Sequence, residues 1–394
     1  MKASERRLLF DLLNIPTAPF REQQVRGHAM ALLDRWRIPH CLDPFGNLLV
    51  GVASTSEYRR LLASRDTEPL RLFIAHMDHP GFHGRRWQDD RHLQVTWHGG
   101  SPVRHLAGAA VWLSAGEGVI AAGRLRHPKI HERGYGLQSA VVEISDSLLR
   151  RRVRQAGRLF GGFEFRKPVW CSGKRIYTRA ADDLVGVFAL LMTARDQFRR
   201  RAKGPPPFIG LLTRAEEVGF VGAVAHLELG WLEMRRRPVV AVSLEASRTL
   251  PGAKIGKGPV VRLGDRSTLF DTNGTRLLSE LAAGLLPNGH QRRIMDGGAC
   301  EATAAAAFGL PVIGLTLPLG NYHNQCYDGG ADCPRSHGPA PEFVHMDDVS
   351  VLLRLCRGLM RTELPWADPW RKARARLSAG RRRHARLLAE QEPG

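Results

Sequence analysis

The stretch Leu72-Phe73-Ile74-Ala75-His76-Met77-Asp78 sets the pattern for this chain, because an unbroken apolar run ends abruptly in side chains that can titrate. Continuous apolar runs of this length suit strands that are buried on both faces, as in a parallel sheet covered by helices. Similar runs occupy residues 208–212, 239–244 and 311–317. We therefore predict at least four buried strands.

Between these runs, apolar residues recur at spacings of three and four, which is the period of one helix face. The pattern covers residues 22–37, returns after Asp182-Asp183, and appears again over 277–286, 302–308 and 349–360. Strands that alternate with helices in this way indicate an α/β fold, with a doubly wound mixed sheet flanked by helices.

Residues 85–171 have a different texture, with short strand-like pieces separated by glycine. The clearest pieces lie at 93–97, 110–114, 118–123 and 140–144. We predict a small β-rich domain over 85–171, inserted into an α/β domain made of 1–84 and 172–361. Residues 362–394 are rich in Arg and poor in apolar residues, which predicts an exposed, basic, partly helical tail.

Composition excludes several classes of protein. Apolar residues make up 43% of the 394 residues and charged residues 24%, which is ordinary for a globular protein and not for a disordered or collagen-like one. The formal net charge is +20. Of the 58 basic residues, 50 are Arg, and this preference for Arg over Lys extends over the whole chain. The charge alone is therefore weak support for nucleic acid binding. Six scattered Cys without a secretory signal or membrane span predict reduced thiols and a cytoplasmic protein with no membrane partner.

Side chains that can bind metal follow the predicted strands. In open α/β sheets, ligands bind at the carboxyl ends of the strands. The residues at these ends are His76 and Asp78, the pair Glu216-Glu217, Glu245 and His323, and Asp182 stands at the start of a predicted helix. Two His and several carboxylates suit Zn²⁺ or Co²⁺, and the set is large enough for two metals that share one carboxylate.

The supporting roles in this site also follow from the spacing. Asp78 stands two residues beyond His76, so we expect its carboxylate to receive the imidazole N–H and fix the tautomer. One member of the Glu216-Glu217 pair can bind metal while the other acts as general base. Each residue taken singly also fits a structural role, such as helix capping by Asp182-Asp183, and only their joint occurrence favours the metal site. His345-Met346-Asp347 repeats the letters of the first motif, but it opens a helix and is assigned to capping.

The motifs at 76–82, 181–186, 215–223 and 320–324 resemble those of dinuclear zinc aminopeptidases of the tetrahedral aminopeptidase and glutamyl aminopeptidase family. The resemblance runs from about residue 8 to 360 and includes Asp43-Pro44-Phe45-Gly46-Asn47-Leu48. It implies an α/β catalytic domain interrupted by a small β apical domain, and homo-oligomers that are often closed dodecamers.

Carried over position by position, the resemblance implies that His76, Asp182 and Glu245 hold one metal. It implies that Asp182, Glu217 and His323 hold the other. Glu216 would be the general base, and the peptide bond between Asp182 and Asp183 would be cis. The expected cofactors are therefore two divalent ions per subunit, Zn²⁺ with Co²⁺ as the alternative.

The chain departs from the family pattern at three positions and in one loop. Glu245 and Glu301 stand where the family usually has Asp, and His79 stands where it usually has an acidic residue. We expect His79 and Glu301 to act in substrate recognition. The loop after His323 contains Cys326, Cys333 and His337 at a spacing that fits no zinc signature, so we interpret it as an insertion.

Our hypothesis is an aminopeptidase that removes N-terminal residues from short peptides, using a metal-bridged water and Glu216 as general base. Glu245 keeps open the alternative of a metal-dependent amidohydrolase, deacylase or carboxypeptidase-type enzyme. A second alternative, drawn from the +20 charge and the Arg-rich tail, is a non-catalytic nucleic-acid-binding or scaffold protein. The charge comes with no recognition motif, so nucleic acid is not expected as a partner.

Overall fold

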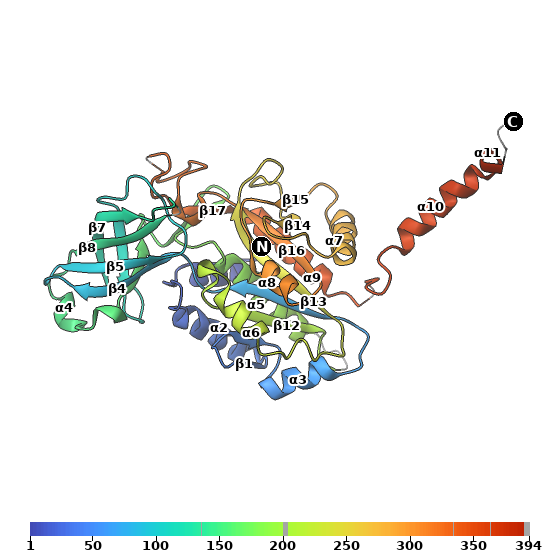
Figure 1. Ribbon diagram of the computed structural model, residues 1–394, viewed down its shortest axis with the longest axis horizontal. Helices are drawn as coiled ribbons and strands as arrows, with labels where there is room; N and C mark the ends of the chain where they lie inside the picture. The colour runs from blue at the N-terminus through green and yellow to red at the C-terminus, as the bar shows by residue number, and fades with distance from the viewer. Residues whose placement is uncertain (135, 200–203, 334, 363, 390–394) are drawn as a thin grey trace.

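A computed structural model describes residues 1–134, 136–199, 204–333, 335–362 and 364–389. Its centre is an eight-stranded mixed sheet (Figure 1). The strands, in their order across the sheet, are β1 (His40–Leu42), β2 (Leu48–Val50), β12 (Phe208–Thr213), β3 (Leu70–His76), β13 (Val239–Arg248), β16 (Val312–Leu319), β14 (Val260–Asp265) and β15 (Gln291–Met295).

The four central strands β12, β3, β13 and β16 are parallel, whereas β2 and β14 pair antiparallel with their inner neighbours. These central strands contain the four apolar runs, so the predicted α/β fold with a mixed sheet is confirmed. Parallel strands bring their carboxyl ends to one edge of the sheet. The register places His76 beside Thr213 and Glu245 beside Thr316 at that edge.

Helices cover both faces of the sheet. One face packs against α1 (Ala3–Leu13), α2 (Gln23–Trp36), α5 (Leu184–Phe198), α7 (Thr272–Leu285) and α9 (Met346–Leu359). The other packs against α3 (Thr55–Ala63), α6 (Val221–Leu227) and α8 (Glu301–Ala307). In β3, Phe73 and Ala75 join the first core while Leu72 and Ile74 join the second. Since side chains alternate along a strand, burial on both faces explains the continuous apolar run.

A closed six-stranded barrel lies at one end of the molecule (Figure 1). Around the barrel, the strands are β4 (Gly81–Trp87), β5 (His92–His98), β8 (Leu137–Ile144), β7 (Ala121–Ile130), β6 (Ala110–Ser114) and β9 (Phe160–Phe163). Between β8 and β9 lie α4 (Leu149–Arg152) and a 3-10 turn (Ala156–Arg158). The predicted piece at 118–123 covers only the start of β7, because exposed basic residues interrupt the apolar positions in the rest of the strand. The predicted boundary after residue 84 falls inside β4, and the domain boundaries stay a prediction.

A small three-stranded sheet joins segments that are far apart in the sequence. It contains β10 (Val169–Ser172), β11 (Arg175–Thr178) and β17 (Glu342–His345), and its register pairs Thr178 with Glu342. At the end of β17, the His345 side chain accepts a hydrogen bond from the Asp347 N–H and caps α9. The capping role predicted for this motif is therefore confirmed.

The C-terminal segment forms α10 (Arg371–Arg383) and α11 (Ala385–Ala389), which extend away from the body of the molecule (Figure 1). Its side chains are almost all exposed, as predicted from its composition. Residues 363 and 390–394 of the predicted tail lie outside the described residues. Among the described residues, none of the helices has both the length and the apolar character needed to cross a bilayer.

We predict that the Phe73–Phe208 contact is a main stabilising element of the sheet. Both rings are buried and their centroids lie 5.4 Å apart. Phe73→Ala should lower the free energy of unfolding by about 3–5 kcal/mol, because it removes a large buried side chain and leaves a cavity. Urea denaturation followed by circular dichroism measures the change. Phe45→Ala is the control, since Phe45 is 50% exposed; equal losses in both variants would contradict the described core.

Candidate functional site

The side chains predicted to bind metal come together at the carboxyl edge of the sheet. His76 ends β3, Glu245 lies in β13 and Asp182 precedes α5. Glu217 lies in a 3-10 turn (Glu216–Val218) after β12, and His323 in another (Tyr322–Asn324) after β16. Ligand atoms of His76, Asp182 and Glu245 lie within 4.8 Å of one another, and the same holds for Asp182, Glu217 and His323.

Asp182 stands between the two histidines. Its Oδ1 lies 3.3 Å from His76 Nε2, and its Oδ2 lies 3.8 Å from His323 Nε2. Glu245 Oε1 is 3.6 Å from His76 Nε2, and Glu217 Oε2 is 3.1 Å from His323 Nε2. Asp182 can therefore act as a ligand in both sets of residues, with one carboxylate oxygen directed towards each set. The peptide bond between Asp182 and Asp183 is cis, as the family resemblance implied.

Several donor and acceptor atoms in this site have no protein partner. The buried side-chain atoms without a hydrogen bond include one from each candidate ligand: His76 Nε2, Asp182 Oδ1, Glu217 Oε1, Glu245 Oε2 and His323 Nε2. Buried polar atoms in proteins are nearly always paired, so five such atoms at one place need a common partner. Imidazole nitrogens and carboxylate oxygens together are a donor set that Zn²⁺ and Co²⁺ accept. The residues therefore fit a divalent cation.

The electrostatics of the site also favour a cation. Burial raises the pKa of Asp182 well above its usual value, and the charges of Glu245 and Glu217 raise it further. Burial likewise raises the pKa of Glu216, although the nearby His76 opposes this shift. For His76, burial disfavours the charged ring, but the neighbouring carboxylates outweigh it and raise its pKa. The site therefore contains more carboxylate groups than the positively charged side chains around it can neutralise.

Asp78 supports the site through a contact that differs from the predicted one. Its carboxylate accepts the N–H groups of Glu216 (3.0 Å) and Glu217 (3.2 Å). The atom closest to His76 Nδ1 is instead the main-chain oxygen of Asp78, at 3.1 Å, while the nearer carboxylate oxygen is 3.6 Å away. The turn after β3 directs the carbonyl towards the imidazole and leaves the carboxylate free to hold the loop after β12.

Glu342 is a supporting residue that the sequence did not reveal. It is fully buried at the start of β17, and its Oε2 accepts the N–H groups of Ala181 (2.7 Å) and Asp182 (3.1 Å). Its Oε1 accepts the N–H of His323 at 2.9 Å. One carboxylate therefore fixes the main chain at two of the candidate ligands. It lies 19 residues after His323, on the far side of the loop that contains Cys326 and Cys333, and no sequence spacing pointed to it.

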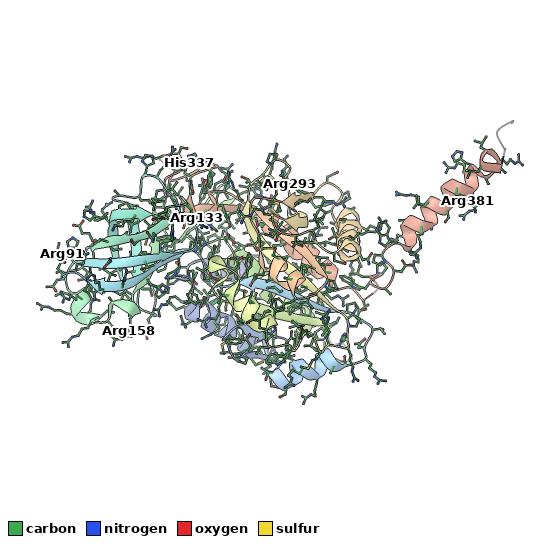
Figure 2. All side chains as sticks on the ribbon, viewed as in Figure 1. Arg91, Arg133, Arg158, Arg293, His337 and Arg381 are labelled. Atoms are coloured by element: carbon green, nitrogen blue, oxygen red, sulfur yellow. A yellow bond between two sulfur atoms is a disulfide. The ribbon has the colours of Figure 1, made fainter. Side chains whose placement is uncertain are left out.

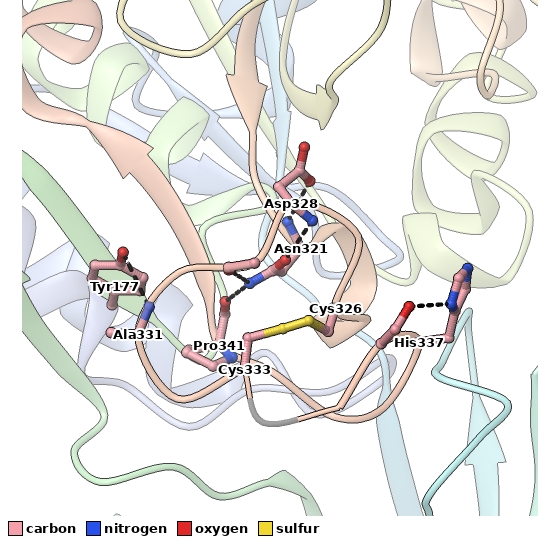
Figure 3. Close-up of a disulfide and its surroundings, with 10 residues drawn as sticks. Tyr177, Asn321, Cys326, Asp328, Ala331, Cys333, His337 and Pro341 are labelled. Atoms are coloured by element: carbon pink, nitrogen blue, oxygen red, sulfur yellow. Dashed lines mark hydrogen bonds between the residues drawn. A yellow bond between two sulfur atoms is a disulfide. The ribbon is translucent and has the colours of Figure 1, made fainter.

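The loop after His323 also contacts the main chain beside that residue. Asp328 Oδ2 accepts the N–H of Asn321 at 3.0 Å, and the N–H of Asp328 donates to Asn321 Oδ1 at 3.0 Å (Figure 3). Asn321 has a left-handed backbone, with φ of 56°. This pair of hydrogen bonds holds the strand-to-turn corner that directs His323 into the site.

Cys326 and Cys333 form a disulfide within this loop, which corrects the prediction of reduced thiols for these two residues (Figure 3). The loop folds back so that their Cα atoms lie 5.8 Å apart, a separation that suits a disulfide. The other four Cys are free. His337 contacts Ser336 and points away from the sulfur atoms, so no metal cluster forms among the described residues of this loop.

A pocket of about 290 Å³ opens onto the candidate metal ligands. Its lining includes Glu216, Glu217, Glu245, His323 and three arginines, Arg248, Arg262 and Arg266. The sequence did not single out these arginines, because Arg is common throughout the chain.

His79 and Glu301, expected to contact substrate, are not among the residues that line this pocket. His79 Nδ1 lies 2.7 Å from the main-chain oxygen of Asp182, and its Nε2 lies 3.2 Å from Asn324 Oδ1. Glu301 is also buried, and burial raises its pKa to about 8. The roles of both residues in substrate recognition stay predictions.

The barrel reaches the site through the loop after β5. A Cβ atom on Gly100 would overlap His323 Nδ1, so only glycine fits there without displacing the imidazole. A Cβ atom added to the neighbouring Gly99 would lie 3.1 Å from the Pro80 ring and 3.2 Å from Glu217 Cβ, which is a tight contact. The edge of the barrel therefore forms one wall beside the His323 group.

We predict that Glu342→Gln weakens metal binding without unfolding the protein. The amide replaces one acceptor oxygen with an NH₂ donor. This donor must then face a main-chain N–H, so two buried donors lack an acceptor. Loss of a supporting partner of this kind typically costs 10- to 100-fold in metal affinity. Equilibrium dialysis against Zn²⁺ measures it, with the exposed Glu143→Gln as control. Unchanged affinity in Glu342→Gln would exclude the positioning role.

Comparison with known proteins places the chain in a family. The family model described as M42 glutamyl aminopeptidase matches residues 60–327. A search of curated proteins found no match. A solved structure of the Pyrococcus horikoshii TET1 peptidase has 22% identity, a TM-score of 0.67, and coverage of 90% of this chain and 99% of that one. An aminopeptidase from the archaeon Desulfurococcus kamchatkensis has 19% identity, a TM-score of 0.71, and coverage of 92% and 96%.

At these identities, the likeness to solved structures shows a common fold. The family match covers about two thirds of the chain and includes all the candidate metal ligands. The chain belongs to the M42 glutamyl aminopeptidase family and is a hydrolytic metallo-aminopeptidase.

Proposed function

We propose that this protein is a dinuclear aminopeptidase that removes N-terminal residues from short peptides. The observation that carries the proposal is the position of Asp182 between His76 and His323, in a buried site with unpartnered ligand atoms. A mononuclear site would not account for a carboxylate that faces a separate His with each of its two oxygens.

His76, Asp182 and Glu245 would hold one ion, and Asp182, Glu217 and His323 the other. Zn²⁺ suits this donor set, with Co²⁺ as the alternative. When bound, such ions act as Lewis acids that polarise a carbonyl and lower the pKa of water to about 7. Glu342 and Asp78 would keep the ligands in place through the main-chain hydrogen bonds described above.

Glu216 is the proposed general base. It lines the pocket and its Oε2 lies 3.8 Å from His76 Nε2, so it is next to the ligands while remaining open to substrate. Its carboxylate would take the proton from the attacking water and pass it to the leaving amine. Asp78 would fix its direction, since the Glu216 N–H donates to the Asp78 carboxylate.

Glu216→Gln should lower kcat for aminoacyl anilides by about 10²- to 10⁴-fold, because the proton acceptor is lost. Its metal content should be unchanged. Glu217→Gln is the matched variant, and it should lose metal as well as activity. Near-normal hydrolysis by Glu216→Gln with metal bound would exclude Glu216 as the base. N-acetylated anilides in the same assay test the deacylase alternative, which their preferential cleavage would favour.

The pocket arginines support a preference for substrates with a carboxylate. Arg262 is only 2% exposed, and its Nη1 lies 3.3 Å from Ser247 Oγ and from Thr316 Oγ1. Within the described residues it forms no ion pair, and its buried Nε has no hydrogen-bond partner. Burial lowers the pKa of Arg262, but the charges of nearby groups, including Glu245 and Asp265, outweigh burial and raise it. None of these groups forms a direct ion pair with it among the described residues, so a substrate carboxylate would provide a charge-assisted partner. We infer an acidic side chain at the substrate N-terminus, which agrees with the family model's glutamyl description.

Arg262→Gln should lower kcat/KM for a glutamyl anilide by about 10- to 100-fold relative to a leucyl anilide, through loss of a charge-assisted contact. Anilides lack a C-terminal carboxylate, so this ratio reports the side chain alone. Arg59→Gln, an exposed Arg outside the pocket, is the control. If the ratio stays constant while cleavage of a Leu-Gly dipeptide falls, Arg262 binds the C-terminal carboxylate instead.

We also propose that the protein forms a homo-oligomer. Support comes from the solved neighbours of the same fold, one described as a dodecamer and another as able to assemble into a tetrahedron or a large octahedral shell.

A further inference from the structure

The C-terminal segment 371–389 concentrates positive charge that has no part in the proposed hydrolysis. It contains seven Arg, one Lys and no Asp or Glu, so eight of the chain's net twenty positive charges lie within 19 residues. All eight cationic side chains are exposed. In the described part of the chain only one of them, Arg374, forms an ion pair, with Asp368. The other seven form no ion pair with any residue that the structure describes.

The segment is anchored at its start and free beyond it. Trp370 Nε1 donates to Asn273 Oδ1 at 2.8 Å, and the Arg276 guanidinium lies 4.2 Å from the centre of the Trp370 ring. Ala373, in the first turn of α10, is 5% exposed. Beyond it the helix extends into solvent, with Arg381 far from the sheet (Figures 1 and 2). These contacts hold the base of α10 against α7 and leave its charged part accessible.

The charges surround most of the helix. At about 100° per residue, the seven basic side chains of α10 cover a sector of roughly 220°. The remaining sector holds Ala373, Leu377 and Gly380. With 13 residues, α10 is about 20 Å long. A rod of this length, charged over more than half of its circumference, can meet negative charges on two sides at once.

We propose that α10 binds the phosphate backbone of a nucleic acid duplex, which revises the expectation from the sequence that nucleic acid is not a partner. A helix with its side chains is about 10–12 Å wide, close to the ~12 Å width of the DNA major groove, whose two walls are phosphate chains. Basic residues on opposite sides of α10 would reach both walls over about six base pairs. The cations are nearly all Arg, which pairs with phosphate through two parallel hydrogen bonds. Such contacts bind duplexes without selecting sequence.

Two other kinds of binding partner fit the segment 371–389 less well. A membrane surface requires a bulky apolar face. The large apolar residues of the segment are Leu377 in α10 and Leu387 and Leu388 in the short α11, so α10 itself offers a single one in the sector without charge. A second copy of this chain is disfavoured by charge, because the residues outside 371–389 still carry +12. The inference is independent of the peptidase proposal, since α10 lies far from the pocket.

The test uses the full chain and a fluorescein-labelled 20-base-pair DNA duplex of mixed sequence, with anisotropy read from 50 to 200 mM NaCl. The test variant carries Arg376→Gln, Arg381→Gln, Arg382→Gln and Arg383→Gln. We expect its affinity to fall at least tenfold at 100 mM NaCl. The slope of log affinity against log salt should decrease by about 3–4, since each lost phosphate contact contributes about 0.9.

The matched control carries Arg35→Gln, Arg37→Gln, Arg59→Gln and Arg60→Gln, which removes the same charge from exposed positions elsewhere. Its affinity should stay within threefold of the unmodified chain, and anilide hydrolysis should be unchanged in both variants. An equal loss of affinity in the control, or no duplex binding by the full chain, would overturn the proposal. So would binding to vesicles containing phosphatidylserine in preference to the duplex.

Discussion

The arrangement of this molecule depends on one carboxylate, Asp182, which faces His76 with one oxygen and His323 with the other. The site is buried and rich in carboxylates, and burying charge without a partner is costly. A cation resolves this conflict because it pairs the unpartnered atoms and offsets the negative charge. Three elements must meet for this to happen: the end of β3, the start of α5 and the turn after β16.

Much of the surrounding structure serves to keep these elements in place. Glu342 binds the main chain at Asp182 and His323 together, so the small three-stranded sheet is tied to the catalytic edge. Asp78 ties the end of β3 to the loop that carries Glu216 and Glu217. The barrel adds a wall in which only glycine fits beside His323. Segments that are far apart in the sequence therefore hold the candidate ligands in place.

The central sheet and the candidate ligands could be predicted because their signals are local. A buried parallel strand reads as an apolar run, and the residue after it points to the crevice where ligands bind. Glu342 and Arg262 could not be found this way. Glu342 lies 19 residues after His323, beyond a long loop, and Arg262 is one of 50 Arg, so its burial beside the pocket appears only in three dimensions. Likewise, the pairing of Cys326 with Cys333 depends on how the loop after His323 folds back on itself.

Anomalous X-ray diffraction from crystals of the active enzyme, collected on both sides of the zinc absorption edge, tests the central claim most directly. We predict two peaks in each subunit, one among His76, Asp182 and Glu245 and the other among Asp182, Glu217 and His323. Cobalt-loaded crystals measured at the cobalt edge would show the same two positions. Active crystals with a single metal that Asp182 does not contact, or with no metal at these residues, would contradict the account.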